Sequence, residues 1–182
     1  MSSTPQCLLL CIDMQPVFIR AIAEGTMIRQ RCAFTLSAAQ GLAIPVIFTE
    51  QVPAKLGLTA AELTALAPQA AALGKDTFSA FANDGIHAAI RAHSPRELLL
   101  CGIETSVCVY QTAVAALQAG YSVTILSDAV GARRPDDARV CLNALAQSGA
   151  RVLPAETVFY ALLESVHHPF FKPYTQLVKT HG

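Results

Sequence analysis

Residues 97–119 read ELLLCGIETSVCVYQTAVAALQA, and this stretch decides the fold class. It begins with an apolar run at 98–101, which is typical of a strand covered on both faces. Residues 105–119 contain neither Gly nor Pro and end before Gly120, a common helix stop, so they predict a helix. A buried strand that leads directly into a helix is the first half of a βαβ unit, in which the two strands are parallel.

The same alternation of short apolar runs and helical segments extends along the chain. The other predicted strands are residues 8–12, 43–49, 122–127 and 150–153, with 70–75 as a candidate that suits a helix equally well. The other predicted helices are residues 26–40, 83–93, 135–148, 156–166 and 170–179. This order predicts an α/β fold, with three αβα layers and a mostly parallel, doubly wound sheet of about six strands. A chain of 182 residues fits a single domain over 1–182.

The composition argues against several classes of partner. Lys and Arg together number 13, and so do Asp and Glu, so the net charge is +0 and we expect no binding to nucleic acid or to an anionic membrane. The apolar runs are much shorter than a membrane span. Hydrophobic residues make up 53% of the chain, which predicts apolar surface hidden in a homo-oligomer, a dimer or larger. The expected partner is a small-molecule substrate.

The N-terminus and the cysteines both indicate a cytoplasmic protein. Residues 1–6 contain no basic residue, so we do not expect the apolar run that follows them to be a secretory signal. No two cysteines form a CxxC pair, which favours reduced thiols over disulfides or a zinc site. The six cysteines are Cys7, Cys11, Cys32, Cys101, Cys108 and Cys141.

Three polar residues follow predicted strands. Asp13 ends the first apolar run, Lys75 ends the candidate strand at 70–75, and Cys108 follows the strand of the opening stretch. Ligands of open α/β sheets bind outside the carboxyl ends of the strands, so an acid, a cation and a thiol are expected beside one pocket. Taken singly, each has an ordinary alternative: a turn carboxylate, a solvated lysine and a small buried thiol.

Cys108 has the best placement for reactivity. If Thr105 caps the helix, Cys108 lies in its first turn, where the helix dipole favours a thiolate. The ordinary pKa values of Asp and Cys differ by about 4.6 units, so moving the thiol proton to a carboxylate costs roughly 6 kcal/mol. We therefore expect the helix N-terminus and Lys75 to lower the pKa of Cys108.

Three ordered motifs carry a family resemblance. IDMQPVF contains Asp13, KDTFSAF contains Lys75, and LCGIETSVCV contains Cys108. Together they resemble the isochorismatase-like cysteine hydrolase superfamily, which includes nicotinamidases, N-carbamoylsarcosine amidohydrolase and isochorismatases. The resemblance covers residues 7–179, and residues 49–57 and 166–172 are most similar to the isochorismatase-domain-containing branch.

The resemblance implies catalytic roles for the matched positions. Cys108 would be the nucleophile, Asp13 the general base and acid, and Lys75 the cation that orders them. It also implies a cis peptide bond between Ile103 and Glu104, with the backbone N–H groups of Glu104 and Cys108 holding the oxyanion.

The resemblance also implies a substrate pocket walled by aromatic residues. The candidate substrate-binding residues are Phe18, Gln15, Phe78, Glu50 and Gln51.

This sequence differs from two groups of the superfamily at positions that determine the expected reaction. Nicotinamidases place an Asp-x-His metal site after the second strand, whereas this chain reads TEQVP at 49–53, without His. We therefore expect no metal and no cofactor. Isochorismatases proper generally lack the cysteine, so Cys108 favours acyl chemistry.

The resulting prediction is a metal-independent cysteine hydrolase, which cleaves a C–N bond of a small amide-type substrate through a thioester. Two alternatives stay open at this point. One is vinyl-ether hydrolysis of the isochorismatase type, with Asp13 as acid and without the thiol. The other is a non-catalytic binding protein of the same fold.

Overall fold

The computed structural model describes residues 6–22 and 24–181, so the expectations about residues 1–5 lie outside the described chain. Its centre is a six-stranded, entirely parallel sheet in the order β3-β2-β1-β4-β5-β6. The strands are β1 (Cys7–Ile12), β2 (Val46–Gln51), β3 (Ala71–Lys75), β4 (Glu97–Ile103), β5 (Ser122–Gly131) and β6 (Arg151–Leu153).

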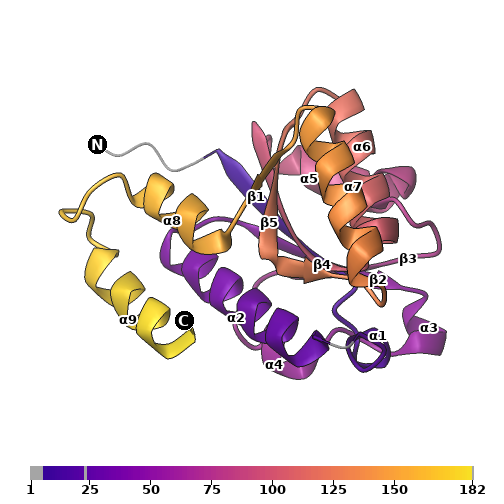
Figure 1. Ribbon diagram of the computed structural model, residues 1–182, viewed down its shortest axis with the longest axis horizontal. Coiled ribbons are helices and arrows are strands. Elements are labelled where there is room, and N and C mark those ends of the chain that lie inside the picture. Colours follow the sequence, from indigo (N-terminus) through magenta and orange to yellow (C-terminus); the bar gives the residue numbers. More distant parts are fainter. Residues whose placement is uncertain (1–5, 23, 182) are drawn as a thin grey trace.

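Helices cover both faces of the sheet, which confirms the predicted three-layer fold (Figure 1). One face is covered by α2 (Gly25–Gly41) and α8 (Ala155–Leu163), and α9 (Phe171–His181) packs against α2, away from the sheet. The other is covered by α5 (Asp84–Ala92), α6 (Tyr110–Gln118) and α7 (Pro135–Gln147). The shorter helical segments are α1 (Pro16–Ile19), α3 (Pro53–Leu56), α4 (Ala61–Thr64), a 3₁₀ turn (Ala80–Ala82) and a π-helical turn (Thr105–Val109).

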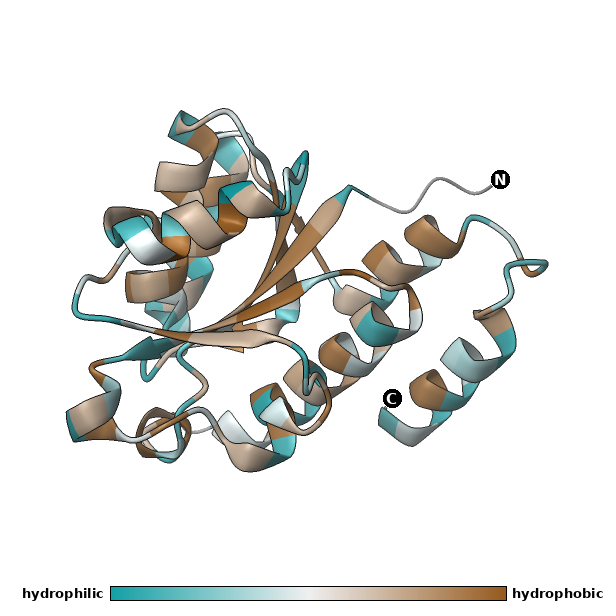
Figure 2. Cartoon of the chain, turned by 180° about the vertical axis from the view of Figure 1, so that it is seen from behind, coloured by the Kyte–Doolittle hydropathy of each residue, from teal (hydrophilic) through white to brown (hydrophobic). Residues whose placement is uncertain are grey.

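The unbroken apolar character of the strands follows from this double cover. Along β1, Leu8, Leu10 and Ile12 face the core beneath α5, α6 and α7, and the alternate residues face the core beneath α2 and α8. Figure 2 shows the resulting hydrophobic band through the middle of the molecule. A strand buried on both faces cannot alternate apolar with polar residues.

The direction of winding reverses between β1 and β4. From β1 the chain runs outward through β2 to β3, and then returns to β4 and runs outward through β5 to β6. The loops that follow β1 and β4 therefore diverge, and they leave a crevice at the carboxyl end of these two strands.

Most predicted elements agree with the structure, and the differences have local causes. Residues 70–75 form a strand, and the Asn83 side chain caps α5 by accepting a hydrogen bond from the Ile86 N–H at 3.0 Å. The strand predicted at 43–49 begins at Val46, because Ala43 lies in a left-handed turn. The condition that Thr105 caps the helix is not met, because Glu104 holds the N-cap position and the first turn is a π turn.

Gly102, on β4 beside β1, has no room for a side chain. Its φ is +110°, and a Cβ there would overlap the carbonyl oxygen of Ile12 on β1. We expect Gly102→Ala to lower the free energy of unfolding by roughly 2–4 kcal/mol, which combines backbone strain with steric overlap. Urea unfolding measures this loss.

Gly120 offers the matched control, because its φ is +86° and no atom lies within 4 Å of the place that a Cβ would take. Gly120→Ala therefore measures the cost of the left-handed backbone alone, and we expect it to lower the free energy of unfolding by about 1 kcal/mol. Equal losses in the two variants would contradict the steric argument.

Candidate active site

Asp13, Lys75 and Cys108 converge at the crevice. Asp13 follows β1, Lys75 ends β3, and Cys108 lies in the π turn after β4. The Lys75 Nζ lies 2.7 Å from the Asp13 Oδ2 and 3.6 Å from the Cys108 Sγ. The exposed fractions of the three residues are 1%, 3% and 7%, so all three are buried. An acid, an ammonium group and a thiol thus share one small volume that excludes most water.

The Lys75 ammonium group is fully engaged in this cluster. Besides Asp13 and Cys108, it donates to the Gln51 Oε1 at 2.5 Å and approaches the Thr77 carbonyl oxygen at 3.2 Å. A buried charge is tolerated when it is paired and when its remaining protons are hydrogen-bonded. Lys75 is therefore held in one position, between the carboxylate and the thiol.

Asp13 is fixed from its other side by Thr49, at the end of β2. The Thr49 Oγ1 donates to the Asp13 Oδ1 at 2.7 Å, and the Asp13 N–H donates to the Thr49 carbonyl oxygen at 3.0 Å. Both carboxylate oxygens of Asp13 thus have a hydrogen-bond donor. Sequence reasoning did not assign Thr49 to the site, although Thr49 ends the predicted strand at 43–49, because a threonine at a strand end gives no separate functional signal.

Cys108 lies in the π turn that links β4 to α6. The Glu104 carbonyl oxygen accepts from the N–H groups of Val107 and Val109, both at 3.1 Å, which are the residues on either side of Cys108. The Ile103–Glu104 peptide bond is cis, as the resemblance implied. The N–H of Cys108 belongs to the first turn of a helical segment, where donors commonly remain available for a ligand.

The electrostatics of Cys108 correct the sequence-based expectation. Burial raises the pKa of the Cys108 thiol to about 12, with the negative charge of Asp13 acting in the same direction and Lys75 opposing it. The expected net lowering of the Cys108 pKa is therefore wrong, although Lys75 acts in the expected direction. Because the thiol stays protonated at neutral pH, any nucleophilic attack needs a base that removes the proton during the reaction.

The charge of Asp13 can be tested through this titration. We expect Asp13→Asn to lower the pKa of Cys108 by about 1–3 units, because a nearby negative charge is removed while Lys75 remains. Thiolate absorbance in the ultraviolet, taken as the difference between each protein and its Cys108→Ala counterpart, measures the shift. The same variant should lose hydrolysis although its thiolate is more populated. A Cys108 pKa that rises in Asp13→Asn would contradict this account.

A cavity of about 320 Å³ opens onto the cluster. Apolar side chains form most of its wall, and Phe78, 54% exposed, stands at its mouth. The lining residues are Asp13, Phe18, Gln51, Phe78, Ile103, Glu104, Val107, Cys108 and Arg133. Of the five predicted substrate-binding residues, Phe18, Phe78 and Gln51 therefore lie on this cavity.

Gln15 and Glu50 are buried behind the cavity wall, which corrects their predicted contact with substrate. The Gln15 side chain accepts from the Gln51 N–H at 2.7 Å and donates to the carbonyl oxygens of Gln51 and Gly57. The Glu50 carboxylate accepts from the Thr59 N–H at 2.7 Å. Both side chains hold the segment after β2 in place and so position Gln51 from behind.

Arg133 is a pocket residue that sequence reasoning missed. Its Nε and its backbone N–H donate to the Glu104 Oε1 at 2.8 and 2.9 Å. Partial burial raises the pKa of Glu104, but the hydrogen bonds and charge of Arg133 outweigh it, so the pKa lies below its usual value. The predicted strand ended at residue 127, whereas β5 continues to Gly131 and carries Arg133 to the pocket.

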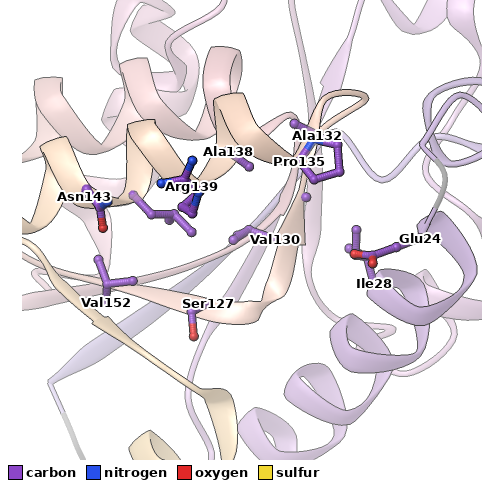
Figure 3. A pocket seen from close by; sticks show the side chains of 12 residues that line it. Glu24, Ile28, Ser127, Val130, Ala132, Pro135, Ala138, Arg139, Asn143 and Val152 are labelled. Carbon is purple, nitrogen blue, oxygen red and sulfur yellow. The ribbon is translucent and has the colours of Figure 1, made fainter.

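A second cavity, also of about 320 Å³, lies between the end of β5, α7 and the start of α2 (Figure 3). Its charged lining residues are Glu24 and Arg139, and Arg139 forms an ion pair with Asp136 at 3.4 Å. Within the described chain, no thiol, imidazole or amine lines it. The reactive groups are therefore concentrated at the first cavity.

Potential metal ligands gather elsewhere. Among residues 6–22 and 24–181, the one group of three or more Cys, His, Asp or Glu side chains with ligand atoms within 4.8 Å of one another is Cys11, Cys32 and Cys101. Within the same residues, no helix is both long and apolar enough to span a bilayer.

Comparison with known proteins finds relatives of this chain in sequence and in fold. Isochorismatase domain-containing protein 2 from Danio rerio is 35% identical over 179 residues, which are 97% of this chain and 88% of the relative. A structure described as the MAR1 ribonuclease from Caenorhabditis elegans has a TM-score of 0.91 and 29% identity, with 98% of this chain and 92% of that chain covered. An octameric Escherichia coli hydrolase of unknown specificity shares the fold, with a TM-score of 0.85, 20% identity, and 97% and 95% coverage.

The family model of the isochorismatase domain matches residues 7–157, a range that contains Asp13, Lys75 and Cys108. With this match and a relative that is 35% identical over almost the whole length, the chain belongs to the isochorismatase family and has its hydrolase fold.

Proposed function

We propose that this protein is a metal-independent cysteine hydrolase that cleaves the C–N bond of a small amide-type substrate through a thioester intermediate. One observation carries the proposal: a single buried ammonium group, Lys75 Nζ, contacts both the carboxylate of Asp13 and the thiol of Cys108 at the wall of a cavity. A nucleophile, a base and a group that orders both are the parts that covalent acyl transfer requires.

The proposed reaction begins with the thiol protonated and Asp13 ionised beside Lys75. Asp13 takes the thiol proton as the Cys108 Sγ attacks the carbonyl carbon, and the carbonyl π electrons move to the oxygen. The N–H groups of Glu104 and Cys108 hold this oxyanion. Protonated Asp13 then gives its proton to the leaving nitrogen, the C–N bond breaks, and a thioester remains on Cys108.

The second half of the reaction reverses these proton movements. Asp13 takes a proton from water, the resulting hydroxide adds to the thioester carbon, and the C–S bond breaks as the thiolate leaves. Asp13 returns its proton to Cys108, and the carboxylic acid departs. Each proton removed from a nucleophile is thus delivered to a leaving group by the same carboxyl group.

The cavity supports a small acyl substrate. A volume of about 320 Å³ lies at the low end of the range for ligand pockets, and its walls are mainly apolar. Arg133 is the one cationic side chain among the residues that line this cavity, and its Nε is already paired with Glu104. This surface and a net charge of +0 favour a small molecule over a nucleic acid as substrate.

The proposed function is tested by looking for the acyl group of the substrate bound covalently to Cys108. The protein is mixed with a panel of small primary amides and the matching esters, quenched in acid and weighed intact. We expect ammonia release from the preferred amides and a mass increase equal to the acyl group, located on Cys108 by peptide mapping. A parallel incubation with RNA is expected to show no cleavage above a no-enzyme control. RNA cleavage without any acyl adduct would overturn the proposal.

The cellular compartment and the oligomeric state of the protein are also proposals. We propose a cytoplasmic homo-oligomer, supported by the six free cysteines, which suit a reducing compartment, and by the octameric fold neighbour. Large apolar side chains stand exposed on the surface of this chain at Met27, Leu58, Val140 and Val166. Light scattering on the purified protein measures the assembly, and a monomer at micromolar concentration would contradict it.

A further inference from the structure

Three cysteine side chains meet in the core on the side of the sheet opposite α5, α6 and α7. Cys11 lies on β1, Cys101 on β4 and Cys32 on α2, and their three Sγ atoms all lie within 4.8 Å of one another. Cys11 and Cys101 are direct partners in the pairing of β1 with β4. All three residues have an exposed fraction of 0%. We call this group the thiol cluster.

We propose that the thiol cluster is a binding site for a thiophilic monovalent d¹⁰ cation, with Cu(I) as the ion of this class to test. A metal–thiolate bond is about 2.3 Å long, so three sulfurs around one trigonal ion stand about 4.0 Å apart. The observed separations lie within 4.8 Å, so a small inward movement of the side chains closes the site. Thiolates are the ligands that select soft ions such as Cu(I).

The donor set of the cluster favours a soft ion of low coordination number. Within the described chain, the group consists of three sulfur atoms, without a carboxylate or an imidazole. Three converging sulfurs supply a trigonal site, whereas a structural zinc ion almost always takes four ligands.

The Cys32 thiol donates a hydrogen bond to the Ala129 carbonyl oxygen at 3.3 Å. Ion binding would release this proton to solvent, without any oxidation or reduction. Low-coordinate binding by sulfur fits such a site.

The test uses the Cys108→Ala protein as background, so that the active-site thiol cannot bind copper. Under anaerobic, reducing conditions, Cu(I) is offered as its coloured bicinchoninate complex, and loss of colour reports transfer to the protein. Because the thiol cluster is fully buried, a second sample is refolded from denaturant with Cu(I) present. We expect one equivalent per chain, and X-ray absorption with sulfur neighbours only.

Substitutions separate the thiol cluster from the other cysteines. Cys32→Ala and, independently, Cys101→Ala should each reduce retained Cu(I) from one equivalent to none, while their metal-free circular dichroism matches the background. Cys7→Ala and Cys141→Ala, outside the cluster, should keep the full equivalent. The proposal is overturned if the background protein retains no Cu(I) in either sample, or if the two cluster variants retain as much as the controls.

Discussion

Cys108→Ala is expected to reduce kcat/KM for the preferred amide by roughly 10⁴-fold or more, because the proposed thioester cannot form without the sulfur. Substrate should still bind, since the cavity walls are unchanged and the removed atom is small. Steady-state kinetics with ammonia release as readout measure the loss, and intact-mass analysis of quenched reactions should show no acyl adduct.

Two matched variants sharpen this result. Cys108→Ser keeps a nucleophilic atom of similar size and should also lose most activity, because a hydroxyl is harder to ionise than a thiol at this buried position. Cys141→Ala removes a thiol from α7, away from the cavity, and should behave as the parent protein. Full activity in Cys108→Ala would instead favour vinyl-ether hydrolysis by Asp13, and inactivity of the parent on every substrate would favour a binding protein.

Lys75→Met is expected to lower the free energy of unfolding by about 3–5 kcal/mol and to abolish hydrolysis. The change keeps a side chain of similar length but leaves the Asp13 carboxylate buried, with its ammonium partner gone. Removing one member of a buried ion pair costs this much, because the remaining charge is not compensated. Urea unfolding, followed by circular dichroism, measures the difference.

A double variant and a surface control make this prediction specific to the pair. Asp13→Asn combined with Lys75→Met removes both charges and should recover a large part of the lost stability, although not activity. Lys55→Met replaces an exposed lysine at the end of α3 and should change stability by no more than about 0.5 kcal/mol. If Lys75→Met unfolds like the parent, the ion pair does not stabilise this core as we infer.

The fold could be predicted because its strands are buried on both faces. Such strands appear in the sequence as unbroken apolar runs, as at residues 98–101, and Ala-rich helical segments separate them. Residues 70–75 were ambiguous because β3 lies at the edge of the sheet, where three of its five residues are exposed and small side chains suffice. The boundaries of β2 and β5 depend on a left-handed turn and a register shift, which local composition does not reveal.

The candidate site was only partly predictable. Asp13, Lys75 and Cys108 stood out because each follows a strand, and parallel strands bring their carboxyl ends to one edge. Sequence position does not reveal on which side of a loop a side chain lies, so Gln15 was expected at the substrate although it supports the wall from behind.

The pKa of Cys108 and the existence of the thiol cluster could not be predicted from the sequence either, because both depend on which groups the fold brings together. The helix-dipole argument for Cys108 neglected burial and the negative charge of Asp13, both of which depend on the folded arrangement. The thiol cluster has ligands at positions 11, 32 and 101, a spacing without any local motif. Its three sulfurs meet only because β1 pairs with β4 in one register and α2 packs across both strands.

The residues that line or support the cavity come from two kinds of segment, strand ends and the segments that follow them. Asp13 and Lys75 are attached to the carboxyl ends of β1 and β3, whereas Phe18, Phe78 and Arg133 come from three separate segments that follow β1, β3 and β5. Under the proposed function, the residues that select the substrate and the residues that react with it therefore lie in different parts of the chain. Protein engineers could exchange Phe18, Phe78 and Arg133 to retarget the protein to new acyl groups, and natural divergence could follow the same route while the reacting atoms stay in place.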